Sequence, residues 1–529
     1  MTKRFFSFAV LVAGVLMTGC TNLDVDIKSE LIPDNFPKTD EQYIAASGAI
    51  YSDFAGGYGT GHWLVSELSG DAALLAANGG NWFDGGRYMQ LHLHSWNAST
   101  PNMADGWSWL FRTINTCNSV YDLLSQTPDS DAKIQSIAEL RVMRALCYYL
   151  LMDYYGGVPL VTKFGEVVKT RNSRSEIFDF VESEVLECAE QLSADNNVAT
   201  YGRPNRMTAY ALLAKLYLNA EVFVGRPMWD EALQMCDEVI DFESQGKVGL
   251  YGNYIDMFKY NNGPQVNEFI FAIPYDENNL RGFIPSRYFW GYISQMATGY
   301  SISTSSCVRV IPRYYDLFTE DPGDIRERTF LTDKLYVEEI TENAVGVTPL
   351  MLGEYWLEHP RELIFVDEET FDMGEGTPVY GGQISLDRMR GYRNNKFMPS
   401  KTQPGRDHSN DLPVFRYADI LLMKAEAILR GATPTDGDTA VSLVNRVRER
   451  SGCAPWSEVD LDGLLDERGR ELSFEAWRRN DLIRFGKYEE VFFDGFKTIT
   501  KMSDTYRRVF PVPQPEIDKN SELEQNPGY

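Results

Sequence analysis

The sequence holds few of the side chains that bind metals or form disulfide bonds. Its five histidines include one closely spaced pair, His92 and His94, and a metal site would need a further ligand that the sequence does not place. The seven cysteines are dispersed without a Cys-x-x-Cys motif, so those after Cys20 are expected to be small buried apolar residues. No twelve-residue loop has the ligand spacing of an EF-hand calcium site. The sequence therefore predicts no metal and no cofactor.

Positive charge is scarce as well. The chain has 50 lysine and arginine residues against 76 aspartate and glutamate residues, which gives a formal net charge of −26 at pH 7. A surface this acidic repels nucleic acids and other polyanions over the Debye length. We therefore expect neither class as a general partner.

Long apolar runs are absent except at the N-terminus, where one run predicts export. The basic pair Lys3-Arg4 precedes an almost unbroken apolar stretch at 5–17, and Cys20 follows two small residues. This run is too short to span a bilayer as a mature helix, and its end resembles a bacterial lipoprotein cleavage site. We expect residues 1–19 to be removed and Cys20 to carry acyl chains that anchor the protein to a membrane. An ordinary signal peptide with a coincidental cysteine is the alternative.

Apolar residues in three stretches recur with the period of an α-helix. The stretches 134–155, 207–222 and 417–429 each place their leucines, alanines and other apolar residues three or four positions apart. This spacing gives one apolar face, and the small alanines allow close approach of a partner helix. Helices paired in this way across short loops resemble degenerate tetratricopeptide-type hairpins. The predicted fold is mainly α, a helical-hairpin scaffold with long irregular loops and a few short strands. A general helical layer is the alternative.

Two stretches lack the helical period and are rich in glycine, proline, asparagine and aromatic residues. They cover 56–101 and 246–412, and the second includes short strand-like runs at 269–274 and 363–366. Binding residues concentrate on loops that a rigid scaffold positions, and these two stretches can converge on one side of the helices. The expected organisation is a signal peptide (1–19), an N-terminal helical region with a first ligand loop (20–245) and a C-terminal region with a second ligand loop and closing helices (246–529).

A set of motifs follows in a fixed order along the chain. After GGVPL at 156–160 come PVFRYADILLMKAEAIL at 413–429, NRVRERSG at 445–452, ERGRELSFEAWRRNDLIRFG at 467–486, FPVP at 510–513 and QNPGY at 525–529. In this order and spacing they resemble the SusD/RagB family of nutrient-binding outer-membrane lipoproteins of the Bacteroidetes. The resemblance spans nearly the whole mature chain, with Ala476-Trp477 in place of a more usual Gly-His-type pair. The motifs themselves are expected to hold the fold together.

The resemblance implies a lipoprotein of the outer membrane, exposed at the cell surface. Such a protein binds glycans without turnover and delivers them to a SusC-like TonB-dependent barrel. Some branches of the family take peptides, so a RagB-type peptide receptor is one alternative. A scaffold that binds only the barrel, with no ligand pocket of its own, is another.

A glycoside hydrolase is the enzymatic alternative. It would need two carboxylates at a set separation with different pKa values. Glu471 and Glu475 are candidates by number alone, one turn apart on an expected helix through 467–477, where Arg478 or Arg479 can pair with Glu475. No nucleophile or metal motif accompanies them, so we predict no catalytic residue.

Two aromatic clusters fit the binding of a sugar. The apolar face of a sugar ring packs on an aromatic ring while its hydroxyls need hydrogen-bond partners. One cluster, at 78–88, is flanked by glycines that allow sharp turns, and the other lies at 283–300. Packing of a long loop is the alternative for each aromatic, and Asp71, which resembles an acidic position of the family, could instead be a cap. The predicted carbohydrate-binding residues are Asp71, Trp82, Arg87, Trp96, Asn97, Tyr288, Trp290 and Tyr292.

Overall fold

The structure is a computed structural model, and it is described here for part of the chain. The described residues are 36–291, 303–332, 336–341, 344–349, 351–352, 355–356, 361–374, 390–400, 405–499 and 503–529. Cys20, the signal peptide and Tyr292 lie outside these ranges, so the predictions made for them stay predictions.

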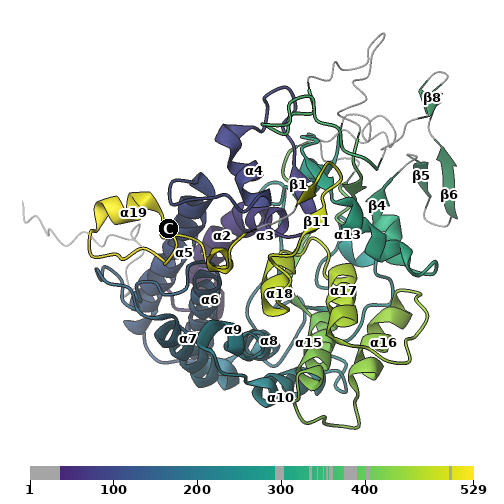
Figure 1. Ribbon diagram of the computed structural model, residues 1–529. Helices are drawn as coiled ribbons and strands as arrows, with labels where there is room; N and C mark the ends of the chain where they lie inside the picture. The colour runs from purple at the N-terminus through teal and green to yellow at the C-terminus, as the bar shows by residue number, and fades with distance from the viewer. Residues whose placement is uncertain are drawn as a thin grey trace, which may run out of the picture.

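Helices make up most of the regular structure (Figure 1), as the sequence predicted. Their bounds are α2 (Asp40–Gly57), α3 (Trp63–Leu68), α4 (Arg87–His92), α5 (Pro101–Ser125), α6 (Asp131–Tyr155), α7 (Arg174–Cys188), α8 (Arg206–Leu218), α9 (Ala220–Val224), α10 (Trp229–Ile240), α11 (Pro285–Phe289), α13 (Pro312–Asp316), α15 (Tyr417–Leu429), α16 (Ala440–Arg450), α17 (Leu461–Glu471), α18 (Arg478–Arg484) and α19 (Gln514–Lys519). The three stretches with helical period correspond to α6, to α8 with α9, and to α15.

Neighbouring helices pack in pairs through much of the molecule. Helix α5 packs against α2 and α6, α6 against α7, α7 against α8, and α8 against α10. Helix α15 then packs against α10, and α16 and α17 pack against α15, so the C-terminal helices continue the stack begun by the N-terminal ones (Figure 1). This is the helical-hairpin scaffold that the periodicity predicted.

Local capping explains where several helices begin and end. Ser173 accepts a hydrogen bond from the amide of Glu176, and the Glu176 carboxylate accepts one from the amide of Ser173, which completes a capping box before α7. Gly486 has φ of 71° directly after the last turn of α18, the left-handed conformation that glycine adopts most easily. It ends that helix as the sequence predicted.

The strands are short and pair two by two within the described residues. They are β1 (Ala73–Leu75) with β3 (Val308–Val310), β2 (Phe269–Ile273) with β10 (Leu412–Arg416), β4 (Phe330–Leu331) with β9 (Arg393–Asn394), β5 (Tyr336–Thr341) with β6 (Ala344–Pro349), β7 (Met351–Leu352) with β8 (Tyr355–Trp356), and β11 (Phe492–Phe493) with β12 (Thr498–Ile499). The strand-like run at 269–274 is β2. The run at 363–366 forms no strand, because its amides bond singly to a loop at Gly495 and to the turn residue Asp372.

The two irregular stretches meet on one side of the helices, near α4, β1 and β11 in the upper part of Figure 1. Strand β1 of the first stretch pairs antiparallel with β3 of the second. A small apolar cluster lies beside this pair and holds the loops together; it consists of Leu74, Ala76, Leu363, Phe365, Phe371 and Met373. The expected convergence of the two loop regions is therefore observed.

An extended set of buried charges lies where the end of β10 meets α16 and α17. We call its centre the buried ion network; it consists of Arg326, Lys396, Arg416 and Arg450 with Glu268, Glu467, Glu471 and Glu475. Each of its eight side chains is at most 5% exposed. The motifs at 413–429 and 467–486 supply much of it, which places them in buried structural contacts; that they hold the fold stays a prediction.

The expected helix through 467–477 is wrong in its second half. Helix α17 ends at Glu471, and Phe474 and Ala476 take φ of 57° and 66°, which no α-helix contains. Glu475 therefore does not pair with Arg478 or Arg479. Its carboxylate contacts Lys396 and Arg416, because the turn directs it into the buried ion network.

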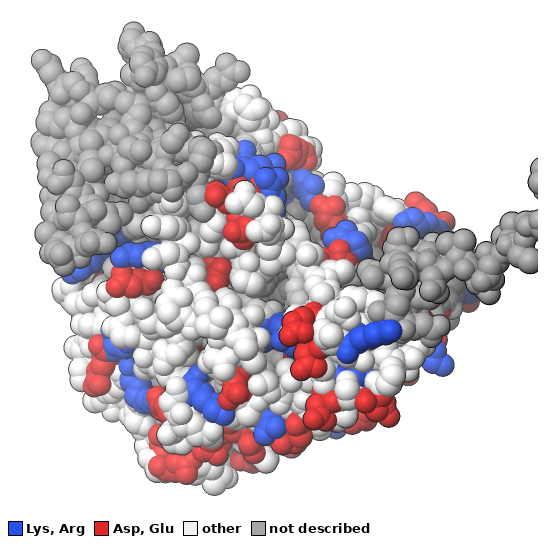
Figure 2. Space-filling model, turned by 180° about the vertical axis from the view of Figure 1, so that it is seen from behind, with Lys and Arg blue, Asp and Glu red and all other residues white. Residues whose placement is uncertain are grey.

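The remaining cysteines and the surface agree with the composition. All six cysteines after Cys20 are buried and free of disulfide bonds. Within the described part of the chain, no helix is both long enough and apolar enough to cross a bilayer. On the face seen in Figure 2, acidic and basic side chains are interspersed, and acidic ones gather along the lower edge.

Candidate functional site

A hollow opens where the two irregular stretches meet, and we call it the Trp82 hollow. Its volume is about 440 Å³. The loop after β1 forms one wall, and α11 with the segment before β3 forms the other. Its lining residues are Asn78, Asn81, Trp82, Asp84, Arg287, Thr304 and Ser305.

The loop that carries Trp82 is fixed in a strained conformation. Trp82 has φ of 68° and Asp84 has φ of 45°, values that residues with a Cβ rarely adopt. The carboxylate of Asp372 accepts hydrogen bonds from the amides of Gly79 and Gly80, both at 2.7 Å. These bonds tie the loop to the second irregular stretch. Strain of this kind is common at ligand sites, where the surrounding structure holds it in place.

Neighbouring rings determine how Trp82 is presented. Its ring meets Tyr288 edge to face, with centroids 5.4 Å apart, and lies 6.2 Å from the ring of Tyr88. The Arg287 guanidinium carbon is 5.8 Å from the Trp82 ring centroid. Because Trp82 is only partly buried, part of its surface remains open to the hollow.

Three polar atoms of the lining have no hydrogen-bond partner among the described residues. They are Asn78 Oδ1, Ser305 Oγ and Arg287 Nε, and each is buried. The side-chain Nδ2 of Asn78 donates to Ser306 O at 2.9 Å, and the side-chain oxygen Oδ1 has no such partner. A buried donor or acceptor without a partner is costly, so these three atoms are candidates for hydrogen bonds to a polar ligand in the hollow.

Three of the predicted aromatics are buried in the core. Trp290 is 1% exposed and donates from Nε1 to Asn395 Oδ1 at 2.9 Å, and Trp96 is 1% exposed and donates to the Tyr529 hydroxyl at 2.7 Å. Tyr288 is 3% exposed and packs edge to face against the Trp82 ring. None of the three lines the Trp82 hollow. In this structure they pack the loops, which was the alternative reading of each.

Arg87 and Asn97 also lie outside the Trp82 hollow. Arg87 donates from Nε to Asn102 Oδ1 at 2.8 Å and pairs with Asp105, so it ties α4 to α5. Asn97 Oδ1 accepts from the amide of Ser99 at 2.8 Å, which shapes the turn before α5. Both side chains have local partners that account for them.

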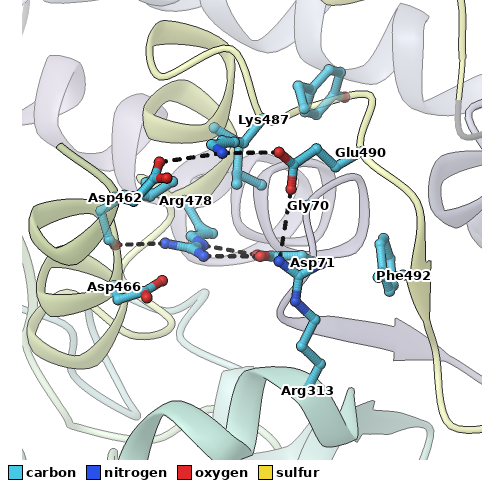
Figure 3. A pocket seen from close by; sticks show the side chains of 12 residues that line it. Gly70, Asp71, Arg313, Asp462, Asp466, Arg478, Lys487, Glu490 and Phe492 are labelled. Carbon is cyan, nitrogen blue, oxygen red and sulfur yellow. Dashed lines mark hydrogen bonds and ion pairs between the residues drawn. The ribbon is translucent and has the colours of Figure 1, made fainter.

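Asp71 lines a separate charged cavity of about 190 Å³, shown in Figure 3. Both of its carboxylate oxygens accept from Arg478, at 2.8 Å each. Burial raises the pKa of Asp71, but the paired Arg478 outweighs burial, and the pKa lies below its usual range. Lys487 bridges Asp462 and Glu490 in the same cavity, at 3.2 and 3.0 Å (Figure 3). Asp71 is thus held in an ion pair outside the Trp82 hollow.

Sequence reasoning missed four residues that matter for the Trp82 hollow: Asn78, Asn81, Arg287 and Ser305. Three of them lie inside or beside the two aromatic clusters, where polar neighbours of an exposed ring could have been noted. Asp372 had no sequence signal, because its partners are nearly 300 positions away along the chain. Within the described residues, no group of three or more His, Cys, Asp or Glu side chains is placed to hold a metal ion.

Comparison with known proteins gives matches along nearly the whole chain. A family model described as the SusD family matches residues 267–529, and one described as "Starch-binding associating with outer membrane" matches residues 30–218. The starch-binding protein SusD of Bacteroides thetaiotaomicron is 25% identical, with 100% of this chain and 99% of that protein covered. The SusD-like protein P2 of Formosa agariphila is 24% identical over the full length of both chains.

Solved structures share the fold. A SusD homolog from Bacteroides thetaiotaomicron superposes with a TM-score of 0.71 at 19% identity, covering 94% of this chain and 98% of that one. A structure described as a laminarin-binding SusD-like protein gives a TM-score of 0.67 at 22% identity, covering 93% and 100%. At these identities the likeness establishes the architecture alone.

Proposed function

Because the chain belongs to the SusD/RagB family, we propose that it binds an oligosaccharide or polysaccharide at the Trp82 hollow and delivers it to a SusC-like TonB-dependent barrel. The protein associates with the outer membrane and acts by binding, without catalysis. The acyl anchor at Cys20 and exposure at the cell surface belong to the same proposal.

The observation that carries the proposal is the pairing of one aromatic surface with unused polar atoms. Trp82 offers an apolar ring to a hollow whose wall holds three buried polar atoms that have no partner in the described part of the chain. A sugar has the complementary chemistry, since its C–H face packs on an indole and its hydroxyls donate and accept hydrogen bonds. Relatives named for binding starch and laminarin support a glycan as the ligand class.

Glu471 and Glu475, the two carboxylates considered for a glycoside hydrolase, form buried ion pairs within the protein. Glu471 pairs with Arg326, Arg416 and Arg450, and burial, which raises its pKa, is outweighed by these cations, so its pKa lies well below the usual range. Such a carboxylate stays ionised and cannot act as a general acid near neutral pH. The proposed function therefore includes no catalytic step.

Binding to a glycan panel tests the proposal. The mature protein is titrated with neutral and acidic oligosaccharides and with peptides, with calorimetry and intrinsic fluorescence as the readouts. Trp82→Ala is expected to weaken glycan binding about 30-fold, because truncating an anchoring aromatic costs about 2 kcal/mol and 1.4 kcal/mol is tenfold. Trp229→Ala, at the start of α10 on the helical side, is the matched control and should bind normally. Binding of peptides alone would reject a glycan receptor.

Delivery to a barrel is tested separately. The full-length lipoprotein is extracted from outer membranes in mild detergent and examined for a copurifying large β-barrel protein. Cys20→Ala should move the protein out of the membrane fraction, because the acyl chains form its proposed anchor. Repeated recovery without a barrel would contradict this part of the proposal.

A further inference from the structure

Arg287 differs from the arginines of the buried ion network because no carboxylate of the described residues forms an ion pair with it; the described contact of its guanidinium is with the Trp82 ring. Its guanidinium forms no hydrogen bond or ion pair within the described part of the chain, and its Nε is buried. Arg416, by contrast, contacts the carboxylates of three glutamates. An unpaired, partly buried guanidinium is costly, so its presence in the wall of a hollow points to a missing anion.

The surroundings of Arg287 sharpen this reading. Burial lowers the pKa of Arg287 and the nearby charge of Arg406 lowers it further, and together they outweigh the smaller opposing effect of the Asp407 carboxylate. Asp84 also lines the Trp82 hollow, but it is exposed, so water screens its charge more strongly than that of Arg287. The wall near Arg287 is therefore a place where an incoming negative charge would be stabilised.

The position of Arg287 relative to Trp82 fits one ligand geometry. The guanidinium carbon lies over the Trp82 ring, 5.8 Å from its centroid, so a sugar that packs on the open part of that ring has Arg287 as a neighbour. A carboxylate or sulfate on such a sugar would then reach the guanidinium, whose planar donors bind these oxyanions with two parallel hydrogen bonds. Asn78 Oδ1 and Ser305 Oγ remain for the hydroxyls.

We propose that the Trp82 hollow selects a glycan whose sugar ring bears an oxyanion, a uronate carboxylate or a sulfate ester, and that Arg287 binds this group. The inference rests on the proposed function, because it takes the Trp82 hollow as the glycan site. The net charge led us to expect no polyanion as a general partner, and this proposal limits that expectation. Repulsion by the acidic surface falls off over about 8 Å at physiological salt, whereas Arg287 would bind the oxyanion in direct contact.

The test compares three oligosaccharides of equal length: a neutral one, one with uronate rings and one with sulfate esters. Calorimetry on the mature protein should give at least tenfold tighter binding for one or both acidic ligands than for the neutral one. Whichever acidic ligand binds identifies the oxyanion. Arg287→Gln should remove this preference by lowering affinity for the acidic ligand at least tenfold more than affinity for the neutral one, and Arg287→Lys should keep part of it.

Controls separate the possible failures. Arg112→Gln, a more exposed arginine on α5, should leave all affinities unchanged, and the melting temperature of each variant shows that it folds. Equal binding of neutral and acidic glycans, or a preference that survives Arg287→Gln, would overturn this inference while leaving the glycan receptor in place. Absence of any glycan binding by the folded protein would overturn the proposed function itself.

Discussion

Replacing Arg416 by methionine tests whether the buried ion network holds the fold. Arg416 is 1% exposed and contacts Glu268 Oε1 at 2.6 Å, Glu471 Oε1 at 2.6 Å and Glu475 Oε2 at 2.8 Å. Methionine keeps the unbranched stem but leaves these carboxylates short of one cation. Removing one partner of a buried ion pair costs about 3–5 kcal/mol, because the charge that remains is buried without compensation.

The expected loss in the free energy of unfolding stays within that range, although Arg416 contacts three carboxylates. Arg450 still contacts Glu268 and Glu471, and Lys396 still contacts Glu475. We therefore expect Arg416→Met to lower the free energy of unfolding by about 4 kcal/mol. Urea titration, followed by tryptophan fluorescence and by circular dichroism, measures this, and coincidence of the two transitions checks that unfolding is two-state.

A matched substitution shows whether burial of the ion pairs causes the loss of stability in Arg416→Met. Arg446 pairs with Glu243, but the two side chains are 36% and 35% exposed. Arg446→Met should cost no more than about 1 kcal/mol, since exposed pairs contribute little. If Arg416→Met were as mild as Arg446→Met, the argument that the motif charges hold the fold would be refuted.

Three further predictions concern the buried carboxylate Glu67, the loop anchor Asp372 and the terminal residue Tyr529. Burial raises the pKa of Glu67 to about 8, so its contribution to stability is full below the unfolded value of about 4.5 and is lost as pH rises towards 8. Glu67→Gln should therefore match the wild type in urea titrations at pH 5 and exceed it at pH 8.5; parallel curves would contradict this. Asp372→Ala should weaken glycan binding about tenfold in calorimetry, since it frees the loop that presents Trp82, whereas Asp367→Ala nearby should not. Tyr529→Phe should lower the free energy of unfolding by about 1–2 kcal/mol, because the Trp96 indole loses its buried acceptor; an unchanged urea midpoint would argue against that role.

The helical scaffold was predictable because its signals are local. The periodicity of 417–429 coincides with α15, and 134–155 falls within α6. The glycine after α18 marked its end correctly. The division of the chain at 245 and 246 stays a prediction. The helix expected over 467–477 is wrong after Glu471. Phe474 and Ala476 adopt positive φ there, although neither residue type favours it, because contacts between Glu475 and charged residues far away in the sequence hold the turn.

The candidate site could be predicted only in outline. Glycines around Trp82 correctly indicated a loop that turns sharply, and they drew attention to the hollow's first wall. Beyond these glycines, nothing in the local sequence shows that Trp82 lines the hollow while Trp96 and Trp290 are buried. The last two are buried because Tyr529 and Asn395 accept their indole hydrogens, and these partners lie far away along the chain.

By itself, the sequence determined the helical scaffold, the family and the acidic character of the protein. Periodicity, motif order and composition can be read along the chain without knowing which distant segments touch. Only the tertiary structure decided which aromatic faces the hollow, which acidic residues are paired inside, and that Arg287 forms no ion pair with any carboxylate that the structure describes. Those outcomes depend on contacts between segments hundreds of residues apart. Burial and pairing are set where such segments meet, so no local pattern can encode them.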